Sequence, residues 1–216
     1  MKTPQDKPLT ESGPHGANRD GELEQSLRRY VEDFVKNNHA AHVVSRGMEV
    51  LGIGFWPIID HMTFRTLHVE ERAKEFLASG YVYDAKLGVI EYENWWAKVY
   101  RKTGYPVLFL DQAFEGARGK GSLIPDWVHT FSDKVLHHVA IRVEDIEKAI
   151  FYLEKQGVAF AGKIVGDKGT DLRQIFTQPE MRAAKTFSVL ELTERHRGYE
   201  GFLPPQADGL MESTRR

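Results

Sequence analysis

The strongest constraint on the fold of this chain is an internal repeat. The segments His61-Met-Thr-Phe-Arg65 and His138-Val-Ala-Ile-Arg142 both have the form His-x-x-x-Arg and lie 77 residues apart. The same offset pairs Gly80 with Gly157, each 19 residues after its histidine. A gap-free offset that spans a strand, a helix and the start of the next strand is typical of a duplicated supersecondary unit.

Each half has the same predicted order of elements. In the first half, a strand over 58–65 precedes a short helix over 69–79, which Gly80 closes, and alternating apolar residues then indicate further strands. The second half repeats this order with a strand over 135–143 and a helix over 145–156. We therefore expect an α+β fold in which tandem βαβββ modules join into one curved mixed sheet with a cavity inside. The later strands are expected at 81–83, 95–100 and 107–110, and at 158–165, 172–177 and 186–193.

The regions outside the two modules differ in composition. The first 21 residues are polar and rich in Pro and Gly, and apolar residues then recur at three- and four-residue steps up to Leu51. These patterns predict a disordered tail, an N-terminal helical segment and four further regions. The expected boundaries are a tail at 1–21, helices at 22–54, the first module at 55–112, a Gly/Pro-rich connector at 113–133, the second module at 134–195, and a C-terminal lid or tail at 196–216.

Composition narrows the class of protein. The 216 residues include no cysteine, which excludes disulfides, thiolate metal sites and a cysteine nucleophile. The chain has no apolar run of about 18 residues and no signal-peptide pattern, and its formal net charge is −2. We expect a cytoplasmic enzyme whose partners are small molecules rather than nucleic acid or membrane, and its oligomeric state stays open.

Strand periodicity places three metal-ligating residue types together. His61 and His138 occupy equivalent positions in the two modules, so both are expected to face the cavity, whereas the adjacent His137 is expected to face away. Glu191 lies within the apolar strand 187–192, where an unpaired carboxylate would be costly. Two imidazoles and one carboxylate form a facial triad that suits non-haem Fe(II).

Several segments resemble a known enzyme family. Asp60-His61, the segment HVAIRVEDI at 138–146, LRQIFTQP at 172–179 and LELTER at 190–195 resemble 4-hydroxyphenylpyruvate dioxygenase of the vicinal-oxygen-chelate superfamily. The His-x-x-x-Arg element and the N-terminal helices are closer to a sister family, the 2-oxoadipate dioxygenase/decarboxylases of lysine catabolism, of which this chain looks like a short form. The resemblance implies a vicinal-oxygen-chelate fold and an Fe(II)-dependent conversion of a 2-oxo acid and O2 to a 2-hydroxy acid and CO2.

The same resemblance assigns residues. His61, His138 and Glu191 match the iron ligands of the family. Arg65 matches the arginine that holds the distal carboxylate of the substrate, which makes it the candidate catalytic and substrate-binding residue. The expectation for Gln174 comes from the strand pattern and not from the resemblance. It lies on the strand that faces Glu191, and we expect it to hydrogen-bond the substrate or that carboxylate.

Other functions and plainer roles stay open from the sequence. The alternatives are a metal-dependent isomerase or lyase that uses Zn(II), Ni(II) or Co(II) without O2, and a non-catalytic metal- or ligand-binding module. Glu191 could instead pair with an arginine as a charge on the rim. Arg142, the equivalent of Arg65 in the second module, could have a structural role. Asp111 falls near the position equivalent to Glu191 and is expected to be solvated or structural. His39 and His42 could bind a metal but are expected to form a polar helix face. The pair Trp95-Trp96 places one indole on each face of its strand.

Overall fold

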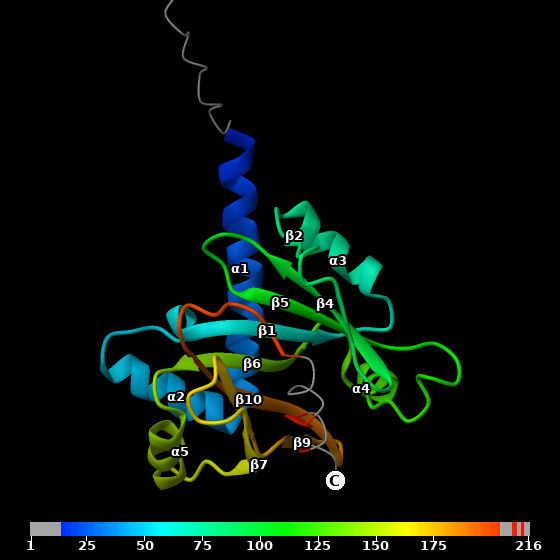
Figure 1. Ribbon diagram of the computed structural model, residues 1–216. Helices are drawn as coiled ribbons and strands as arrows, with labels where there is room; N and C mark the ends of the chain where they lie inside the picture. Colours follow the sequence, from blue (N-terminus) through cyan, green and yellow to red (C-terminus); the bar gives the residue numbers. More distant parts are fainter. Residues whose placement is uncertain (1–13, 204–208, 211–212, 214–216) are drawn as a thin grey trace, which may run out of the picture.

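The computed structural model describes residues 14–203, 209–210 and 213, and its centre is a curved mixed sheet (Figure 1). The strand order is β2-β4-β5-β1-β6-β10-β8-β7, with β3 paired to β4 and β9 to β10. The strands are β1 (Ile59–Arg65), β2 (Val82–Tyr83), β3 (Val89–Glu91), β4 (Trp95–Arg101), β5 (Val107–Ala113), β6 (Leu136–Val143), β7 (Phe160–Val165), β8 (Leu172–Thr177), β9 (Glu180–Arg182) and β10 (Lys185–Arg195).

The sheet is built from two equivalent halves. Strand β1 pairs parallel with β5, and β6 pairs parallel with β10. Strands β1 and β6 pair antiparallel at the centre and so join the two halves. The order outward from the centre is β1-β5-β4-β2 on one side and β6-β10-β8-β7 on the other. The predicted fold of tandem βαβββ modules in one mixed sheet is therefore confirmed.

The two module helices end in the same way. Helix α3 (Val69–Ala78) and helix α5 (Ile146–Lys155) are each followed by a glycine with positive φ, 87° at Gly80 and 83° at Gly157. The backbone N–H one residue later donates to a carbonyl of the last helical turn in both copies, at 3.0 Å. A residue with a Cβ adopts this conformation only at a cost, which explains why the repeat keeps glycine there.

The predicted N-terminal helical segment is a helix pair. Helix α1 (Pro14–Asn37) and helix α2 (His39–Val50) are separated by Asn38, whose extended backbone breaks the first helix and whose side chain caps the second by accepting from Ala41 N–H at 2.9 Å. Helix α1 begins inside the segment predicted to be a disordered tail. Helix formation is cooperative, so a stable helix can extend into residues of poor propensity. The rest of that predicted tail, 1–13, lies outside the described residues.

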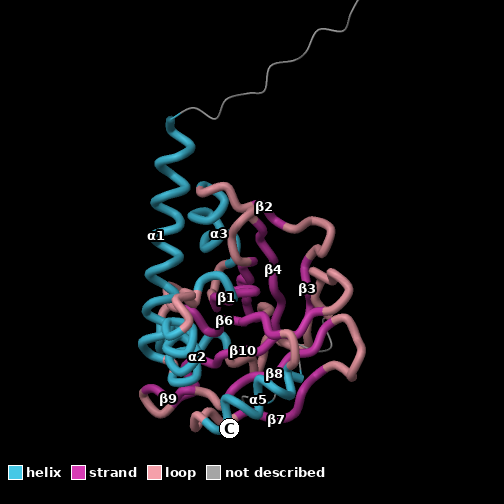
Figure 2. Tube along the Cα trace, turned by 90° about the vertical axis from the view of Figure 1, so that its left-hand side faces the viewer, coloured by secondary structure: helices cyan, strands magenta, loops and turns pink. Residues whose placement is uncertain are grey.

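The side-chain alternation of the strands separates two faces. Helices α1, α2, α3 and α5 contribute to one hydrophobic core on the outer face of the sheet, and Figure 2 shows α1 running beside the strands. The apolar residues of the central strands that join this core lie two apart, as a pleated strand requires. They are Met62, Phe64, Leu108, Leu110, Val139, Ile141, Leu190 and Leu192.

The segment 113–133, predicted as a Gly/Pro-rich connector, contains a helix that was not predicted from the sequence. Helix α4 (Ile124–Phe131) starts with proline in its first turn and buries Trp127, whose indole N–H donates to the carbonyl of Phe187 at 2.8 Å. A 3₁₀ turn, η1 (Trp56–Ile58), leads into β1. Among the described residues, none of the helices combines the length and apolar character needed to cross a bilayer.

Candidate metal centre

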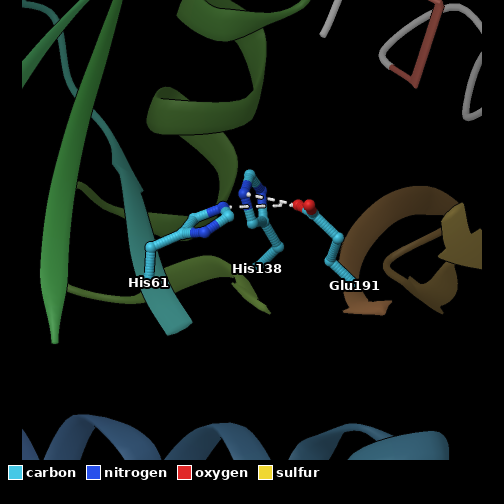
Figure 3. Close-up of side chains that lie close together, drawn as sticks. All are labelled: His61, His138 and Glu191. Atoms are coloured by element: carbon cyan, nitrogen blue, oxygen red, sulfur yellow. Dashed lines mark ion pairs between the residues drawn. The ribbon is translucent and has the colours of Figure 1, made fainter. Parts of the chain in front are cut away.

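His61, His138 and Glu191 converge from three central strands, β1, β6 and β10 (Figure 3). All three side chains are buried, and one ligand atom of each lies within 4.8 Å of the others. Glu191 Oε2 is 3.4 Å from His61 Nε2 and 3.5 Å from His138 Nε2. The structure thus brings together the three residues proposed from the sequence as metal ligands.

Two β-bulges at the β1–β6 junction place one extra residue beside each histidine. In the register of this pair, Asp60 is skipped between Ile59 and His61, and His137 is skipped between Leu136 and His138. Asp60 and His137 are counterparts in the 77-residue repeat. His137 does not line the cavity, in agreement with its expected orientation, but the bulge turns its ring edge toward that of His138. Its Nδ1 lies 3.0 Å from Nδ1 of His138.

Asp60 orients His61 through a network of charged groups. Its Oδ2 is 2.9 Å from His61 Nδ1, so Nδ1–H can donate to the carboxylate and leave Nε2 facing the centre. Arg195 donates to both carboxylate oxygens, at 2.8 and 2.9 Å, and Arg142 donates to Oδ1. Burial favours a higher pKa for Asp60, but His61 and Arg195 outweigh it and hold that pKa well below its usual range.

Hydrogen bonds to Oε1 hold the carboxylate of Glu191 in place. Gln174 Nε2 donates to Oε1 at 2.5 Å, and Thr193 Oγ1 donates to the same oxygen at 2.9 Å. Oε2 is the oxygen that faces the two imidazoles. The guanidinium of Arg195 binds Asp60 rather than Glu191, and the Glu191 carboxylate is instead oriented by Gln174 and Thr193.

The electrostatics of the centre are unequal between the two histidines. Burial disfavours the charged form of His61, but Glu191 and Asp60 outweigh it and raise its pKa to about 9. Burial dominates at His138 and lowers its pKa to about 3, against the attraction of Glu191. Burial also raises the pKa of Glu191, but the two histidines reverse this and the pKa is lowered. The carboxylates of Glu191 and Asp60 thus favour a positive charge on His61, and a bound cation would supply a positive charge at the same place.

The donor set fits a first-row divalent metal. Ligands about 2.1 Å from a metal and at right angles to one another are about 3 Å apart, close to the separations found here. Two imidazoles with one carboxylate match the facial set of non-haem Fe(II) and leave coordination positions open. The three side chains therefore fit such a metal ion by their chemistry and by the separations of their ligand atoms.

Aromatic side chains line the cavity beside this centre. Phe202 packs edge-on against Phe109 and His61, with ring centroids 4.5 and 5.3 Å apart. Of the tryptophan pair, Trp95 lines the cavity, while Trp96 packs against the outer core. The described part of the C-terminal segment thus contributes to the wall, whereas its predicted role as a lid stays a prediction. The lining residues are His61, Thr63, Tyr92, Trp95, Phe109, Asp111, His138, Gln174, Phe176, Glu191, Phe202, Leu203 and Leu210.

Arg65 and Asp111 lie side by side but differ in access to the cavity. They are register partners on β1 and β5, and both are buried. Asp111 lines the cavity, whereas the guanidinium of Arg65 lies 5.5 Å from the ring of Trp127 and Arg65 is absent from the lining. The solvated alternative for Asp111 is therefore wrong. The substrate-binding role of Arg65 stays a prediction.

Asp111 is also not the counterpart of Glu191. In the second module Glu191 pairs with Ala140, and in the first module the equivalent of Ala140 is Thr63, which pairs with Phe109. Phe109 therefore occupies the position of Glu191, and Asp111 lies two residues further along the strand. The connections between the equivalent strands differ in length, so the fixed sequence offset no longer holds at β5 and β10.

The remaining candidates have structural or surface positions. Arg142 binds Asp60 and also pairs with the exposed Glu200 at 3.2 Å, which agrees with a structural role. His39 and His42 are exposed on α2, as expected for a polar helix face. A second group of carboxylates, Asp145, Glu147 and Glu194, lies beside α5 and is compensated by Arg173 and His196.

Sequence comparisons do not place the chain in a family. A scan against protein-family models gives no match. A search of the curated proteins also gives no match.

Comparison with solved structures identifies the fold. A hydroxyglutarate synthase from Oryza sativa, solved in complex with 2-oxoadipate, aligns with a TM-score of 0.69 at 16% identity, over 99% of this chain and 98% of that one. A protein assigned to the glyoxalase superfamily from Ralstonia eutropha JMP134 gives 0.60 at 12% identity, over 82% and 84%. A 4-hydroxymandelate synthase mutant from Streptomyces coelicolor gives 0.55 at 18% identity, over 74% of this chain and 54% of that one. The chain has the glyoxalase, or vicinal-oxygen-chelate, fold.

Proposed function

We propose that this protein is an Fe(II)-dependent dioxygenase/decarboxylase that converts a 2-oxo acid and O2 to a 2-hydroxy acid and CO2. The observation that carries the proposal is the convergence of His61, His138 and Glu191 on the wall of a cavity that five aromatic side chains also line. The fold shared with a hydroxyglutarate synthase that binds 2-oxoadipate supports a 2-oxo acid as substrate. Within that class, 2-oxoadipate and related oxo diacids are the first compounds to examine.

Bound Fe(II) would supply redox chemistry and open positions for the oxo acid and O2. The protein residues supply its surroundings. Asp60 and His137 hold the Nδ1 sides of the two histidines, and Gln174 and Thr193 hold Oε1 of Glu191. Phe109, Phe176 and Phe202 cover the centre with apolar surface and limit access of water. The overall reaction balances: one 2-oxo acid and one O2 give one 2-hydroxy acid and one CO2.

The test is an oxygen-electrode screen of anaerobically purified protein loaded with Fe(II). Oxo acids of different chain length are supplied, and O2 uptake, CO2 release and the hydroxy acid are measured together. We expect the three quantities to be equal for a preferred substrate and to vanish in a Glu191→Gln variant. Product formation that persists without O2 would favour an isomerase or lyase, and metal binding without turnover on any oxo acid would favour a binding module.

A further inference from the structure

Asp111 has an unusual place in the cavity. It is only 2% exposed and lines the same cavity as the metal centre, yet its Oδ1 has no hydrogen-bond partner within the described part of the chain. A buried carboxylate without a partner destabilises a fold, so such a group points to a ligand that completes its hydrogen bonding. The mechanism proposed above does not use this residue.

The neighbour of Asp111 changes what this end of the cavity can recognise. Arg65 is the register partner of Asp111 across the β1–β5 pair, and their opposite charges attract. Asp111 lines the cavity and Arg65 does not, so a ligand meets the carboxyl group rather than the guanidinium. A ligand carboxylate placed here would bring a second negative charge close to Asp111, whose own charge already compensates that of Arg65. Like charges at a buried site oppose each other strongly.

We propose that Asp111 determines specificity: it selects 2-oxo acids whose far end is a neutral hydrogen-bond donor, such as a carboxamide, over those that end in a carboxylate. This inference rests on the proposed function, because it concerns the substrate of the same site. A donor group would satisfy Oδ1, whereas a carboxylate would leave it unpaired and face its charge. A site that hydrogen-bonds a donor discriminates strongly against an analogue that lacks it.

The charge of Asp111 sets the conditions of the test. Burial raises its pKa to about 7, against the attraction of Arg65 and His61. At pH 8.5 the carboxyl group is therefore mostly ionised. Discrimination against a carboxylate-ended acid should be stronger at this pH than at pH 6, where a protonated Asp111 can donate to that carboxylate.

The experiment compares isosteric ligands that differ only at the far end. 2-Oxoglutarate and 2-oxoadipate are each matched with their ω-amides, which keeps shape and chain length constant. The open-chain concentration of every compound is determined by NMR. Calorimetric titration of metal-loaded protein under anaerobic conditions at pH 8.5 measures affinity, and O2 uptake measures kcat/KM separately. We expect the better of the two amides to bind at least about 10-fold more tightly than its acid.

Asp111→Asn gives the sharpest prediction, because it removes the negative charge and keeps the shape. The variant should bind the diacid at least about 10-fold more tightly than the unaltered protein does, because the negative charge that opposes a ligand carboxylate is removed. Asp111→Ser serves as a second neutral variant if the first does not fold. Equal or tighter binding of the acids by the unaltered protein, or weaker diacid binding by both neutral variants, would overturn the inference. The expected binding order without any O2 uptake would instead overturn the proposed function alone.

Discussion

Each module lends one imidazole to the centre, His61 from β1 or His138 from β6, and the two neighbouring strands then differ. Strand β10 carries Glu191 where β5 carries Phe109. Two residues further on, β5 carries Asp111 where β10 carries Thr193, which donates to Glu191. One carboxylate is enough for a triad because both imidazoles converge. The duplicated backbone brings the two imidazoles together, while the unequal residues give the centre its carboxylate from the second module and place Phe109 and Asp111 on the cavity wall from the first.

The largest effect is expected from removing the only carboxylate of the triad. Glu191→Gln keeps the volume of the side chain but replaces a charged metal ligand by a neutral one, so turnover should fall by at least about 100-fold. Loss of a residue that only supports a ligand already lowers metal affinity or activity by about 10- to 100-fold. Steady-state O2 uptake checks this. Glu70→Gln, on the exposed surface of α3, is the matched control. Comparable activity in the two variants would remove Glu191 from the centre.

A second prediction separates the two supporting residues that the bulges place. Asp60→Asn should weaken Fe(II) binding by about 10- to 100-fold, because it replaces a charge-assisted partner of His61 by a neutral one. His137→Asn should weaken binding less, because His138 loses only a neutral partner. Anaerobic metal titration of both variants measures the difference. A greater loss in the His137 variant would contradict the account of the bulges.

The third prediction concerns the cost of Asp111. Burial raises its pKa in the folded protein to about 7 from an ordinary value of 3.8, so the folded state binds a proton more tightly than the unfolded chain. Below about pH 4 the residue is protonated in both the folded and the unfolded state and costs no stability by ionisation. As the pH rises from about 4 to 7 the unfolded chain loses this proton first, so the free energy of unfolding falls. Asp111→Asn should therefore stabilise the metal-free protein by a few kcal/mol at pH 8, in order of magnitude, and by much less at pH 4. Chemical unfolding in the presence of a chelator at both pH values measures this, and a pH-independent difference would be inconsistent with it.

The smallest effect is expected at the arginine that the repeat pairs with Arg65. Arg142 binds Asp60 with a side chain that is 49% exposed, and Asp60 keeps Arg195 and His61 as partners without it. Arg142→Gln should cost about 1 kcal/mol or less. Arg195→Gln should cost more, because the side chain of Arg195 is only 4% exposed. Thermal unfolding of the pair ranks them, and the reverse order would show that Arg142 has a larger role.

Much of this architecture could be predicted because it depends on periodicity. The His-x-x-x-Arg repeat and the two helix-closing glycines predicted the modules, and strand alternation brought His61, His138 and Glu191 to one face. Those features are local, and they are encoded within a few residues of sequence.

What could not be predicted depends on register between strands. The bulges that turn Asp60 toward His61 and His137 toward His138 arise where β1 meets β6, and no single segment of sequence shows them. For the same reason, the sequence offset placed Asp111 near the position equivalent to Glu191, whereas the strand register gives that position to Phe109. The connections that precede β5 and β10 differ in length, so a fixed offset does not align these two strands. The contribution of Phe202 to the cavity likewise follows from tertiary packing of the C-terminal segment.

The most direct test of this account is an anaerobic titration of the metal-free protein with Fe(II), followed by calorimetry and by metal analysis after gel filtration. The account predicts one Fe(II) per chain, with affinity greatly reduced in His61→Ala, His138→Ala and Glu191→Gln and retained in Asp111→Asn. Absence of binding, or a bound ion that survives all three ligand substitutions, would contradict a shared centre at the junction of the two modules.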